Sequence, residues 1–423
     1  MNVTIQPAAL SGSLRAIFSK SHAHRQLICA ALSEKESVLP CPVFSQDIAA
    51  TVRCLQALGA KIDTTDSSCK ITPTKDAAGT AVLDCGESGS TYRFLVPVAC
   101  ALGADAAFLL SGKLPQRPME PLWQALEAHG ITVSEKGSNM PHVCGQLLPG
   151  QYTIAGNISS QFLSGLLFAL PLLQGNSELI ITGGLQSGGY LQMTLDALQD
   201  FSITVLPTET GFLIPGGQKY MPPEVLTPEG DWSNAAFWMC AAAARGNGIT
   251  LTGLRHDTLQ GDRAICSVLE RFGAKISYLP DGVTVHPAPL RAITLDSADI
   301  PDLVPAIAVA ACAAQGCTVI ENIARLRIKE SDRVATICAA IHALGGRAEA
   351  TENAIKIYGK PLSGGTVDGC NDHRIVMLAA AASGLCAQPV KILDAQAVNK
   401  SYPHFFEDFT ALGGVVGKGV DAQ

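Results

Sequence analysis

Apolar helix-like runs end six times along the chain in the same way, with a short stop and then a strand-like stretch. The six stop residues are Gly59, Gly130, Ser202, Gly273, Gly345 and Gly413, at successive steps of 71, 72, 71, 72 and 68 residues. A glycine at this place commonly takes the left-handed conformation that ends a helix. The near-constant step predicts six copies of one structural repeat.

Each repeat has further matching segments upstream of its stop. A strand-like stretch such as residues 317–323 precedes the last helix, and before it comes an apolar run with a polar start, such as residues 87–101. Runs that are apolar all round are typical of buried helices, although Pro97 and Pro171 are expected to bend or shorten two of them. Each repeat therefore predicts the order strand, buried helix, strand, outer helix, strand, strand, which is an α/β fold.

The length of 423 residues exceeds one ordinary core and favours two domains of three repeats each. The sixth repeat ends without its last strand, and the unclaimed strand at residues 2–7 could replace it. We therefore expect one domain from residues 1–16 and 230–423 and a second from residues 17–229. The chain would cross between them twice, with an active site in the cleft between the two domains.

Composition agrees with a soluble cytoplasmic enzyme. The net charge of -7 argues against a nucleic-acid or anionic-membrane partner, and the longest uncharged apolar run, residues 162–173, is too short to span a bilayer. Met1 begins no basic-then-apolar leader. We therefore expect no nucleic acid and no membrane among the partners.

Cofactor and metal signals are equally weak. The 14 cysteines include no CxxC pair and mostly lie in apolar runs, as reduced core cysteines do. His22 and His24 match no zinc pattern, and we expect a solvated or capping role for them. Neither a GxGxxG motif nor a Walker loop is present, so we expect no nucleotide cofactor and no metal.

The candidate chemistry lies in two rows of loops that open the helices. Free N–H groups and the helix dipole favour an anion at such starts. The residues there that add cations, hydroxyls or amides are Lys20, Ser21, Arg25, Ser88, Gly89, Ser90, Arg93, Ser159, Ser160, Gln161, Asn371, His373 and Arg374 in the first row, and Arg117, Lys329, Glu330, Arg333 and Lys400 in the second. Taken singly, the Ser and Asn residues are more simply N-caps, each contributing about 1 kcal/mol. Recurrence of cations at matching positions of an acidic chain favours small polyanionic substrates with phosphate and carboxylate groups.

Eight segments carry a family resemblance when they are taken in order. They are SKSHAHR, GESGSTYR, QRPM, NISSQFLSGLL, LQGDR, RIKESDR, NDHR and NKSYP. Over essentially its full length the chain resembles the 3-phosphoshikimate 1-carboxyvinyltransferases, also called 5-enolpyruvylshikimate-3-phosphate (EPSP) synthases. The resemblance implies a two-domain enolpyruvyl transferase fold, an inside-out α/β barrel with three βαβαββ repeats in each domain. It also implies a monomer without a cofactor.

The activity that this resemblance implies belongs to the shikimate pathway to chorismate and the aromatic amino acids. The enolpyruvyl group of phosphoenolpyruvate is transferred to the 5-hydroxyl of shikimate 3-phosphate by addition and elimination through a tetrahedral intermediate, and phosphate is released. Fixed cations would offset the repulsion between two anions that must come within bonding distance.

Site residues follow from the resemblance position by position. Those implied for shikimate 3-phosphate are Lys20, Ser21, Arg25, Ser159, Ser160, Gln161, Ser187, Tyr190, Asp302 and Lys329. Those implied for phosphoenolpyruvate are Lys20, Gly89, Ser90, Arg117, Gln161, Arg333, Arg374 and Lys400.

The matched carboxylates are Asp302 and Glu330. We assign Asp302 as the base toward the 5-hydroxyl, and Glu330, with Lys20, as the proton donor to the methylene carbon. Local alternatives exist for both carboxylates: Asp302 could be an N-cap before Pro305, and Glu330 a first-turn acid favoured by the helix dipole.

Two positions depart from the family pattern. Glu87 stands where relatives have asparagine, so its carboxylate is expected to point away from the anion or to pair with a cation, and Arg325 replaces another asparagine. The sister transferase that acts on UDP-N-acetylglucosamine is an alternative, although residues 113–120 lack the reactive cysteine usual in that family. A binding protein that senses a phosphorylated metabolite is another, but a sensor would need neither acid nor base.

Overall fold

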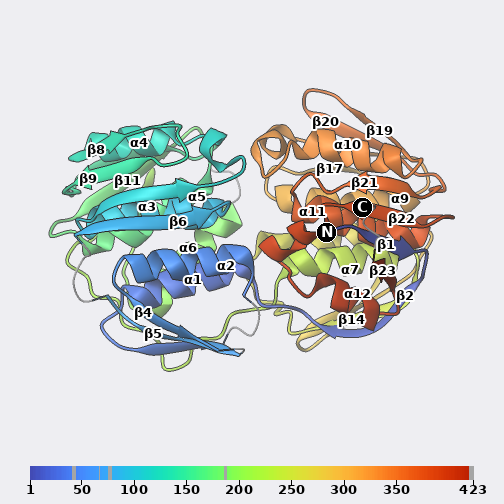
Figure 1. Cartoon of the computed structure of the whole chain (residues 1–423), viewed down its shortest axis with the longest axis horizontal. Helices are drawn as coiled ribbons and strands as arrows, with labels where there is room; N and C mark the ends of the chain where they lie inside the picture. The colour runs from blue at the N-terminus through green and yellow to red at the C-terminus, as the bar shows by residue number, and fades with distance from the viewer. Residues whose placement is uncertain (41–43, 66, 75–78, 185–187, 419–423) are drawn as a thin grey trace. The chain divides into compact units, whose positions relative to one another are not determined.

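The computed structural model describes residues 1–40, 44–65, 67–74, 79–184 and 188–418. The chain forms two compact units (Figure 1). Unit 1 combines Met1–Ser19 with Glu229–Gln423, and unit 2 is Lys20–Pro228.

Unit 2 contains three repeats with two helices each. Its helices are α1 (Lys20–Ala31), α2 (Gln46–Ala57), α3 (Gly89–Ala101), α4 (Glu120–Glu127), α5 (Ser160–Ala169) and α6 (Gly188–Asp200), with 3-10 turns η1 (Leu114–Gln116) and η2 (Leu170–Leu172). Its strands are β3 (Ser37–Pro40), β4 (Lys61–Thr64), β5 (Ser68–Thr72), β6 (Thr80–Gly86), β7 (Asp105–Leu110), β8 (Ile131–Ser134), β9 (His142–Gly145), β10 (Gln151–Ala155), β11 (Ser177–Thr182), β12 (Leu206–Pro207) and β13 (Gly211–Ile214). The sheet orders are β3-β5-β4, β6-β7-β9-β8 and β10-β11-β13-β12.

Unit 1 contains the other three repeats. Its helices are α7 (Trp232–Ala244), α8 (Ile265–Phe272), α9 (Val304–Ala313), α10 (Arg333–Ala343), α11 (His373–Ala382) and α12 (Phe405–Ala411), with 3-10 turns η3 (Gly261–Ala264), η4 (Pro301–Leu303), η5 (Ala324–Ile328), η6 (Ser383–Leu385) and η7 (Ala395–Lys400). Its strands are β1 (Val3–Gln6), β2 (Leu10–Arg15), β14 (Gly246–Thr252), β15 (Lys275–Leu279), β16 (Gly282–His286), β17 (Thr294–Asp296), β18 (Cys317–Glu321), β19 (Arg347–Ala350), β20 (Ala354–Tyr358), β21 (Gly365–Asp368), β22 (Val390–Leu393) and β23 (Val415–Lys418). The sheet orders are β15-β16-β14-β2, β17-β18-β20-β19 and β21-β22-β1-β23.

The repeat β6-α3-β7-α4-β8-β9 shows the common pattern. Strands β6 and β7 are parallel and joined through α3, whereas β9 runs antiparallel to both β7 and β8. A parallel pair needs such a crossover, and an antiparallel pair needs only a turn. The α/β class predicted from the sequence is therefore confirmed, and this repeat has the predicted βαβαββ order, whereas the sheet of the first repeat has three strands among the described residues.

The first fifteen residues contribute strands to two sheets of unit 1. Strand β1 lies antiparallel between β22 and β23, in the place that the sixth repeat leaves open. Strand β2 pairs in parallel with β14 and serves as the first strand of the fourth repeat. The second role was not foreseen, because β2 has only one fully buried residue, Leu10, and shows no apolar alternation.

All six stop residues have the left-handed backbone that the repeat predicts. The φ angles are 104° at Gly59, 92° at Gly130, 63° at Ser202, 97° at Gly273, 79° at Gly345 and 89° at Gly413. In five repeats the next amide closes the motif by donating to a carbonyl five residues back, as Ala274 does to Leu269 and Gly346 to Ile341. Ser202 takes this strained conformation because it allows the same hydrogen bond, from the Ile203 amide to the Leu198 carbonyl, to end the helix.

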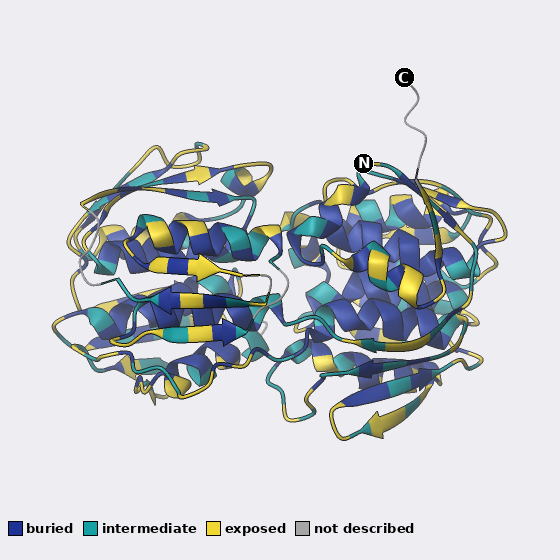
Figure 2. Ribbon diagram, turned by 60° about the horizontal axis from the view of Figure 1, so that its bottom comes forward, coloured by how far each residue is buried: buried dark blue, intermediate teal, exposed yellow. Residues whose placement is uncertain are grey.

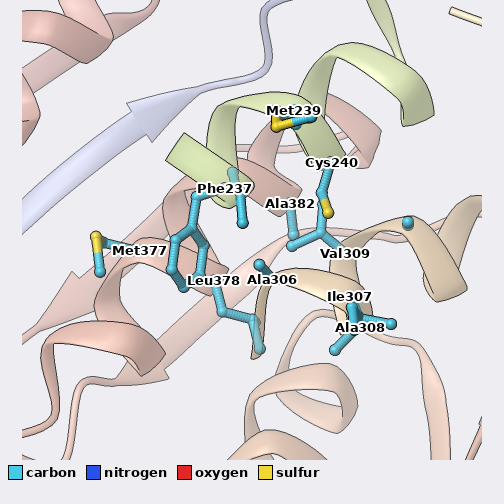
Figure 3. Close-up of a cluster of buried hydrophobic side chains, with 14 of the residues drawn as sticks. Phe237, Met239, Cys240, Ala306, Ile307, Ala308, Val309, Met377, Leu378 and Ala382 are labelled. Atoms are coloured by element: carbon cyan, nitrogen blue, oxygen red, sulfur yellow. The ribbon is translucent and has the colours of Figure 1, made fainter. Parts of the chain in front are cut away.

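The core of each unit is built on its apolar helices. In unit 1, side chains of α7, α9 and α11 point into one cluster, with Phe237, Val309 and Leu378 among its members (Figure 3). Figure 2 shows these inner helices almost wholly buried, whereas the strands alternate buried and exposed positions. The polar starts of the inner helices are thereby fixed by a rigid core.

Two prolines in the inner helices of unit 2 have different consequences. Pro97 lies inside α3, which continues to Ala101, whereas α5 ends just before Pro171, in the turn η2. Pro97 cannot donate to the Arg93 carbonyl one turn earlier. Gly165 of α5 lies against that carbonyl, where a Cβ atom would be 2.3 Å from the oxygen. The helices α3 and α5 can approach this closely only because residue 165 has no side chain.

Candidate active site

Arg333, the first residue of α10, is the centre of a charged cluster in unit 1. Its side chain is only 1% exposed and donates to Asp302 Oδ1 at 2.6 Å, to Glu330 Oε2 at 2.6 Å and to Asp372 Oδ2 at 2.9 Å. One planar guanidinium therefore holds three carboxylates in fixed directions. The two proposed acid and base groups, Asp302 and Glu330, are brought together by this contact.

Asp302 has two further cationic neighbours. Lys329 Nζ lies 3.3 Å from Asp302 Oδ1, and Arg374 Nε lies 3.7 Å from the same oxygen. Arg374 Nη1 also donates to the Asp302 backbone carbonyl at 2.8 Å. The cations expected to bind anions in unit 1 thus surround one carboxylate.

The cations of this cluster are paired with carboxylates. Lys329, Arg333 and Arg374 are balanced by Asp302, Glu330 and Asp372, which share contacts with them. Burying three cations together without partners would be costly. The three cations are therefore held in place by carboxylates of the same unit.

The pKa shifts follow from burial and from these charges. Burial alone would lower the pKa of Arg333, but Asp372, Glu330 and Asp302 outweigh it and raise the pKa above its usual value. Burial lowers the pKa of Lys329 to about 8, with Asp302 opposing and Arg333 reinforcing the shift. Burial and the charge of Asp302 raise the pKa of Asp262 to about 6. Groups that titrate near neutral pH, such as Lys329 and Asp262, are typical of functional sites.

Lys400, the remaining predicted cation of unit 1, ends the turn η7 before α12 and contacts the loop that precedes α11. It is 5% exposed and donates from Nζ to the Asn371 carbonyl at 2.5 Å. The next residue, Asp372, caps α11 by accepting from the Arg374 amide at 3.0 Å. Lys400 is therefore connected to the Arg333 cluster through this loop.

Arg25 is the buried cation of α1 in unit 2. Its guanidinium donates to Thr194 Oγ1 at 2.8 Å and to the backbone carbonyls of Ser21 at 2.6 Å and Tyr190 at 2.8 Å. It also lies over the ring of Phe94, 5.1 Å from the centroid. Burial lowers the pKa of Arg25 to about 10. Three neutral acceptors orient this cation and leave its charge available to an anionic group.

Gln161 joins the starts of α3 and α5. Its Nε2 donates to Ser90 Oγ at 2.9 Å, and its Oε1 accepts from Arg93 Nη1 at 2.8 Å. Its backbone amide donates to Ser159 Oγ, so Ser159 is an N-cap of α5, as the simpler reading held. The predicted residues Ser90, Ser159, Ser160 and Gln161 therefore lie in one connected group.

Arg117 reaches back to the start of α3. A Cβ atom at Gly89 would lie 2.6 Å from Arg117 Nη1, so the guanidinium occupies the space that a larger residue would need. Arg117 also lines a cavity of about 280 Å³ with Tyr92, Met119 and Trp123. The cation and the amide-rich helix start are therefore adjacent.

Lys20, the first residue of α1, forms an ion pair with Asp47 at 2.6 Å. Asp47 lies in the first turn of α2. The proposed proton donor is thus held by a carboxylate that the sequence reasoning did not name.

Several expectations are corrected by the structure. Asp302 is not an N-cap: it lies within η4, and α9 starts after Leu303 without a side-chain cap. Glu330 is not a first-turn acid, because Asp332 is the N-cap of α10 and Glu330 precedes it. His22 and His24 are neither solvated nor capping, since both are buried within α1.

Ser187, Glu87 and Arg325 are the other positions singled out from the sequence. Ser187 lies outside the described residues. The Glu87 side chain lies against Gly112, where a Cβ atom would be 2.4 Å from its Oε2. Arg325 lies on η5, and its charge contributes to the lowered pKa of Lys329.

Three residues of these clusters were not named from the sequence: Asp47, Asp262 and Asp372. Asp262 and Asp372 stand inside the matched segments LQGDR and NDHR, so the motifs themselves contained the signal. Asp47 stands in no matched segment. Within the described ranges, no group of three or more His, Cys, Asp and Glu side chains is placed to hold a metal ion. No helix in the part of the chain that the structure describes is long and apolar enough to cross a membrane.

Sequence comparisons match the chain to one protein family. Residues 5–409 match the model of the family described as EPSP synthase (3-phosphoshikimate 1-carboxyvinyltransferase). A 3-phosphoshikimate 1-carboxyvinyltransferase of Clostridium kluyveri is 40% identical over 418 residues, and one of Clostridium novyi is 38% identical over 428; each alignment covers 98% of both chains.

Solved structures show the same fold. EPSP synthase from Acinetobacter baumannii superposes with a TM-score of 0.82 at 24% identity, over 99% of this chain and 100% of that one. The enolpyruvyl transferase NikO from Streptomyces tendae gives 0.80 at 18% identity, over 98% of each chain. With the family match over nearly all its length and relatives at about 40% identity, the chain belongs to the EPSP synthase family.

Proposed function

We propose that this chain transfers the enolpyruvyl group of phosphoenolpyruvate to the 5-hydroxyl of shikimate 3-phosphate, releasing phosphate and supplying aromatic amino acid biosynthesis. Family membership supports the reaction. The observation that supports the assignment within this chain is that Arg333 holds Asp302 and Glu330, the two carboxylates assigned as base and acid, on one guanidinium.

Addition requires one proton to leave and another to arrive. Asp302 takes the proton of the 5-hydroxyl as its oxygen bonds to the central carbon of phosphoenolpyruvate, and Glu330, with Lys20, delivers a proton to the methylene carbon. Elimination then expels phosphate while the new methyl group loses a proton. The two carboxylates suit these transfers because each has a fixed partner that keeps its direction.

Shikimate 3-phosphate gains access to Asp302 by replacing a cation. The contact of Lys329 with Asp302, at 3.3 Å, is longer than that of Arg333, at 2.6 Å. We assign Lys329 to move from Asp302 to the substrate, which opens one side of the carboxylate to the hydroxyl while Arg333 keeps its contact with Oδ1. The remaining contacts of shikimate 3-phosphate are assigned to Lys20, Ser21, Arg25, Ser159, Ser160, Gln161, Ser187 and Tyr190.

Phosphoenolpyruvate is assigned to the second group of cations and helix starts. In unit 2 these are Lys20, the Gly89 and Ser90 start of α3, Arg117 and Gln161. In unit 1 they are Arg333, Arg374 and Lys400. Both groups act on the same pair of substrates in this proposal, and the chain works as a cytoplasmic monomer.

Phosphate release from phosphoenolpyruvate tests the proposal. We expect release with shikimate 3-phosphate, and none with UDP-N-acetylglucosamine or without an acceptor. Release with the nucleotide sugar alone would favour the sister transferase, and binding without release would favour a sensor. Size-exclusion chromatography with light scattering tests the monomer.

A further inference from the structure

Two lateral connections tie the starts of α1, α2 and α3 together in unit 2. The first is the ion pair Lys20–Asp47 at 2.6 Å. The second is a buried chain in which each step is 2.7 Å, running from His24 Nδ1 to Thr51 Oγ1, to Thr91 Oγ1 and to Ser88 Oγ.

The two connections have matching positions on their helices. Lys20 and His24 are four residues apart on α1, and their partners Asp47 and Thr51 are four residues apart on α2. Residues at this spacing share one face of a helix. One face of α1 therefore contacts one face of α2 at two successive turns, through Lys20–Asp47 and His24–Thr51.

The second connection is wholly inside the protein. His24, Thr51 and Thr91 are 0% exposed, and Ser88 is 1% exposed. Burial first, and then the charges of Lys20 and Arg25, hold the pKa of His24 well below its usual value. The imidazole is therefore neutral at pH 7 and carries a single N–H.

The last hydrogen bond of this series, from Thr91 to Ser88, sets the direction of the other two. Thr91 Oγ1 donates to Ser88 Oγ, so it accepts from Thr51, and Thr51 in turn accepts from His24 Nδ1–H. The other ring nitrogen, Nε2, has no hydrogen-bond partner among the described residues and is the unprotonated one in this assignment. The series of hydrogen bonds thus begins at the His24 imidazole and ends at Ser88, the residue that caps α3.

The residues at the two ends bear on the anion site. Ser88 immediately precedes Gly89 and Ser90, the start of α3 beside Arg117. Thr91 Oγ1 also lies 3.3 Å from the Asp47 carbonyl, so the hydrogen-bonded series passes close to the partner of Lys20, although the Thr91 proton goes to Ser88. The distance between the Lys20 ammonium and the α3 amides therefore depends on both connections.

We infer that His24, Thr51 and Thr91 are positioning residues that set the start of α3 against Lys20, so that both reach the same group of phosphoenolpyruvate. The inference rests on the proposed function and adds to it three residues that touch no substrate. A misplacement of about 1 Å can cost on the order of 100-fold in rate, which makes such buried supports consequential.

Removing one hydroxyl tests this role. We expect Thr51→Val to raise the KM for phosphoenolpyruvate by about 5- to 20-fold and to change the KM for shikimate 3-phosphate by less than about 2-fold. Thr51→Ser restores the hydroxyl and should return the KM to within about 3-fold of wild type. The matched control is Thr318→Val in unit 1, since Thr318 is also 0% exposed and its hydroxyl has no partner among the described residues.

A second variant protects the test against loss of folding. Thr91→Val interrupts the same chain at its next step, and the double variant Thr51→Val with Thr91→Val should raise the KM no further than the larger single effect, because one chain is broken only once. Additive effects, an unchanged KM for phosphoenolpyruvate in both single variants, or an equal rise in both KM values would overturn the inference. A lower melting temperature with unchanged KM values would show a purely structural role.

The outcome is separable from that of the proposed function. Absence of phosphate release by the wild-type chain with shikimate 3-phosphate counts against the proposed function alone. Calorimetric titration of phosphoenolpyruvate in the presence of shikimate 3-phosphate then decides the inference: weaker binding in Thr51→Val than in Thr51→Ser supports it, and equal binding overturns it.

Discussion

Arg333 donates from Nη1 to Asp302 Oδ1 at 2.6 Å, across 31 residues of sequence and from the first residue of α10 to the turn before α9. The contact lies within the second repeat of unit 1 and joins the starts of its two helices, α9 and α10. It makes the direction of the proposed base dependent on a cation that is also assigned to substrate.

Replacing Asp302 by Asn should slow turnover without preventing substrate binding. The amide keeps the shape and can still accept from Arg333, but it cannot take the proton of the 5-hydroxyl. Loss of a general base typically costs about 100- to 10,000-fold. Steady-state kinetics should show this fall in kcat, and calorimetry should show retained binding of shikimate 3-phosphate.

The control for this variant is Asp257→Asn, which alters an exposed carboxylate paired with Arg255. It should leave kcat near the wild-type value. If Asp302→Asn also turned over at the wild-type rate, the base would have to be another group, with Glu330 the next candidate.

The pH dependence of kcat/KM for shikimate 3-phosphate should follow the titration of Lys329. Its pKa is lowered to about 8, so the ammonium is charged below that pH and neutral above it. We therefore expect kcat/KM for shikimate 3-phosphate, which reports the free enzyme, to fall as the pH rises through about 8. Lys329→Arg keeps the charge and should move this fall to higher pH, whatever its absolute rate. The same alkaline fall in both proteins would assign it to a different group.

A methyl group at position 89 should disturb Arg117 selectively. The added Cβ of Gly89→Ala would lie 2.6 Å from Arg117 Nη1, and the cavity that Arg117 lines gives the displaced guanidinium room to move. The KM for phosphoenolpyruvate should rise by roughly 10-fold, or about 1.4 kcal/mol, while folding is retained.

The matched control is Gly79→Ala, because a Cβ atom at Gly79 would meet nothing within 4 Å. Its KM values should remain at the wild-type level. A Gly89→Ala variant with unchanged affinity for phosphoenolpyruvate would argue against a role of Arg117 in binding it.

Packing between α3 and α5 should depend on residue 165. In Gly165→Ala the new Cβ would lie 2.3 Å from the Arg93 carbonyl oxygen, which is backbone and cannot turn aside. Overpacking of this kind costs about 1 to 3 kcal/mol. Thermal unfolding should show a lower melting temperature, by roughly 2 to 4 °C for each kcal/mol in a domain of this size. A melting temperature equal to that of Gly79→Ala would contradict the close approach.

Local patterns in the sequence determined the repeat and the positions of the candidate loops. Gly59 and Gly273 mark helix ends because a helix is terminated by its own neighbouring residues, and apolar runs mark buried helices because their exposure is decided residue by residue. The same reasoning placed Lys20, Arg117 and Arg333 at helix starts, and a missing strand in the sixth repeat indicated the place of β1.

Only the tertiary structure decided which of these residues are partners. Arg333 with Asp302, Lys20 with Asp47 and His24 with Thr51 join residues 27 to 31 positions apart. Such pairs leave no periodic signal, because their separation depends on how helices from different strands pack and not on the helix repeat itself. Packing therefore determines the balance of charge around Asp302 and the burial of His24. The helix starts near which these residues lie are determined by the local sequence.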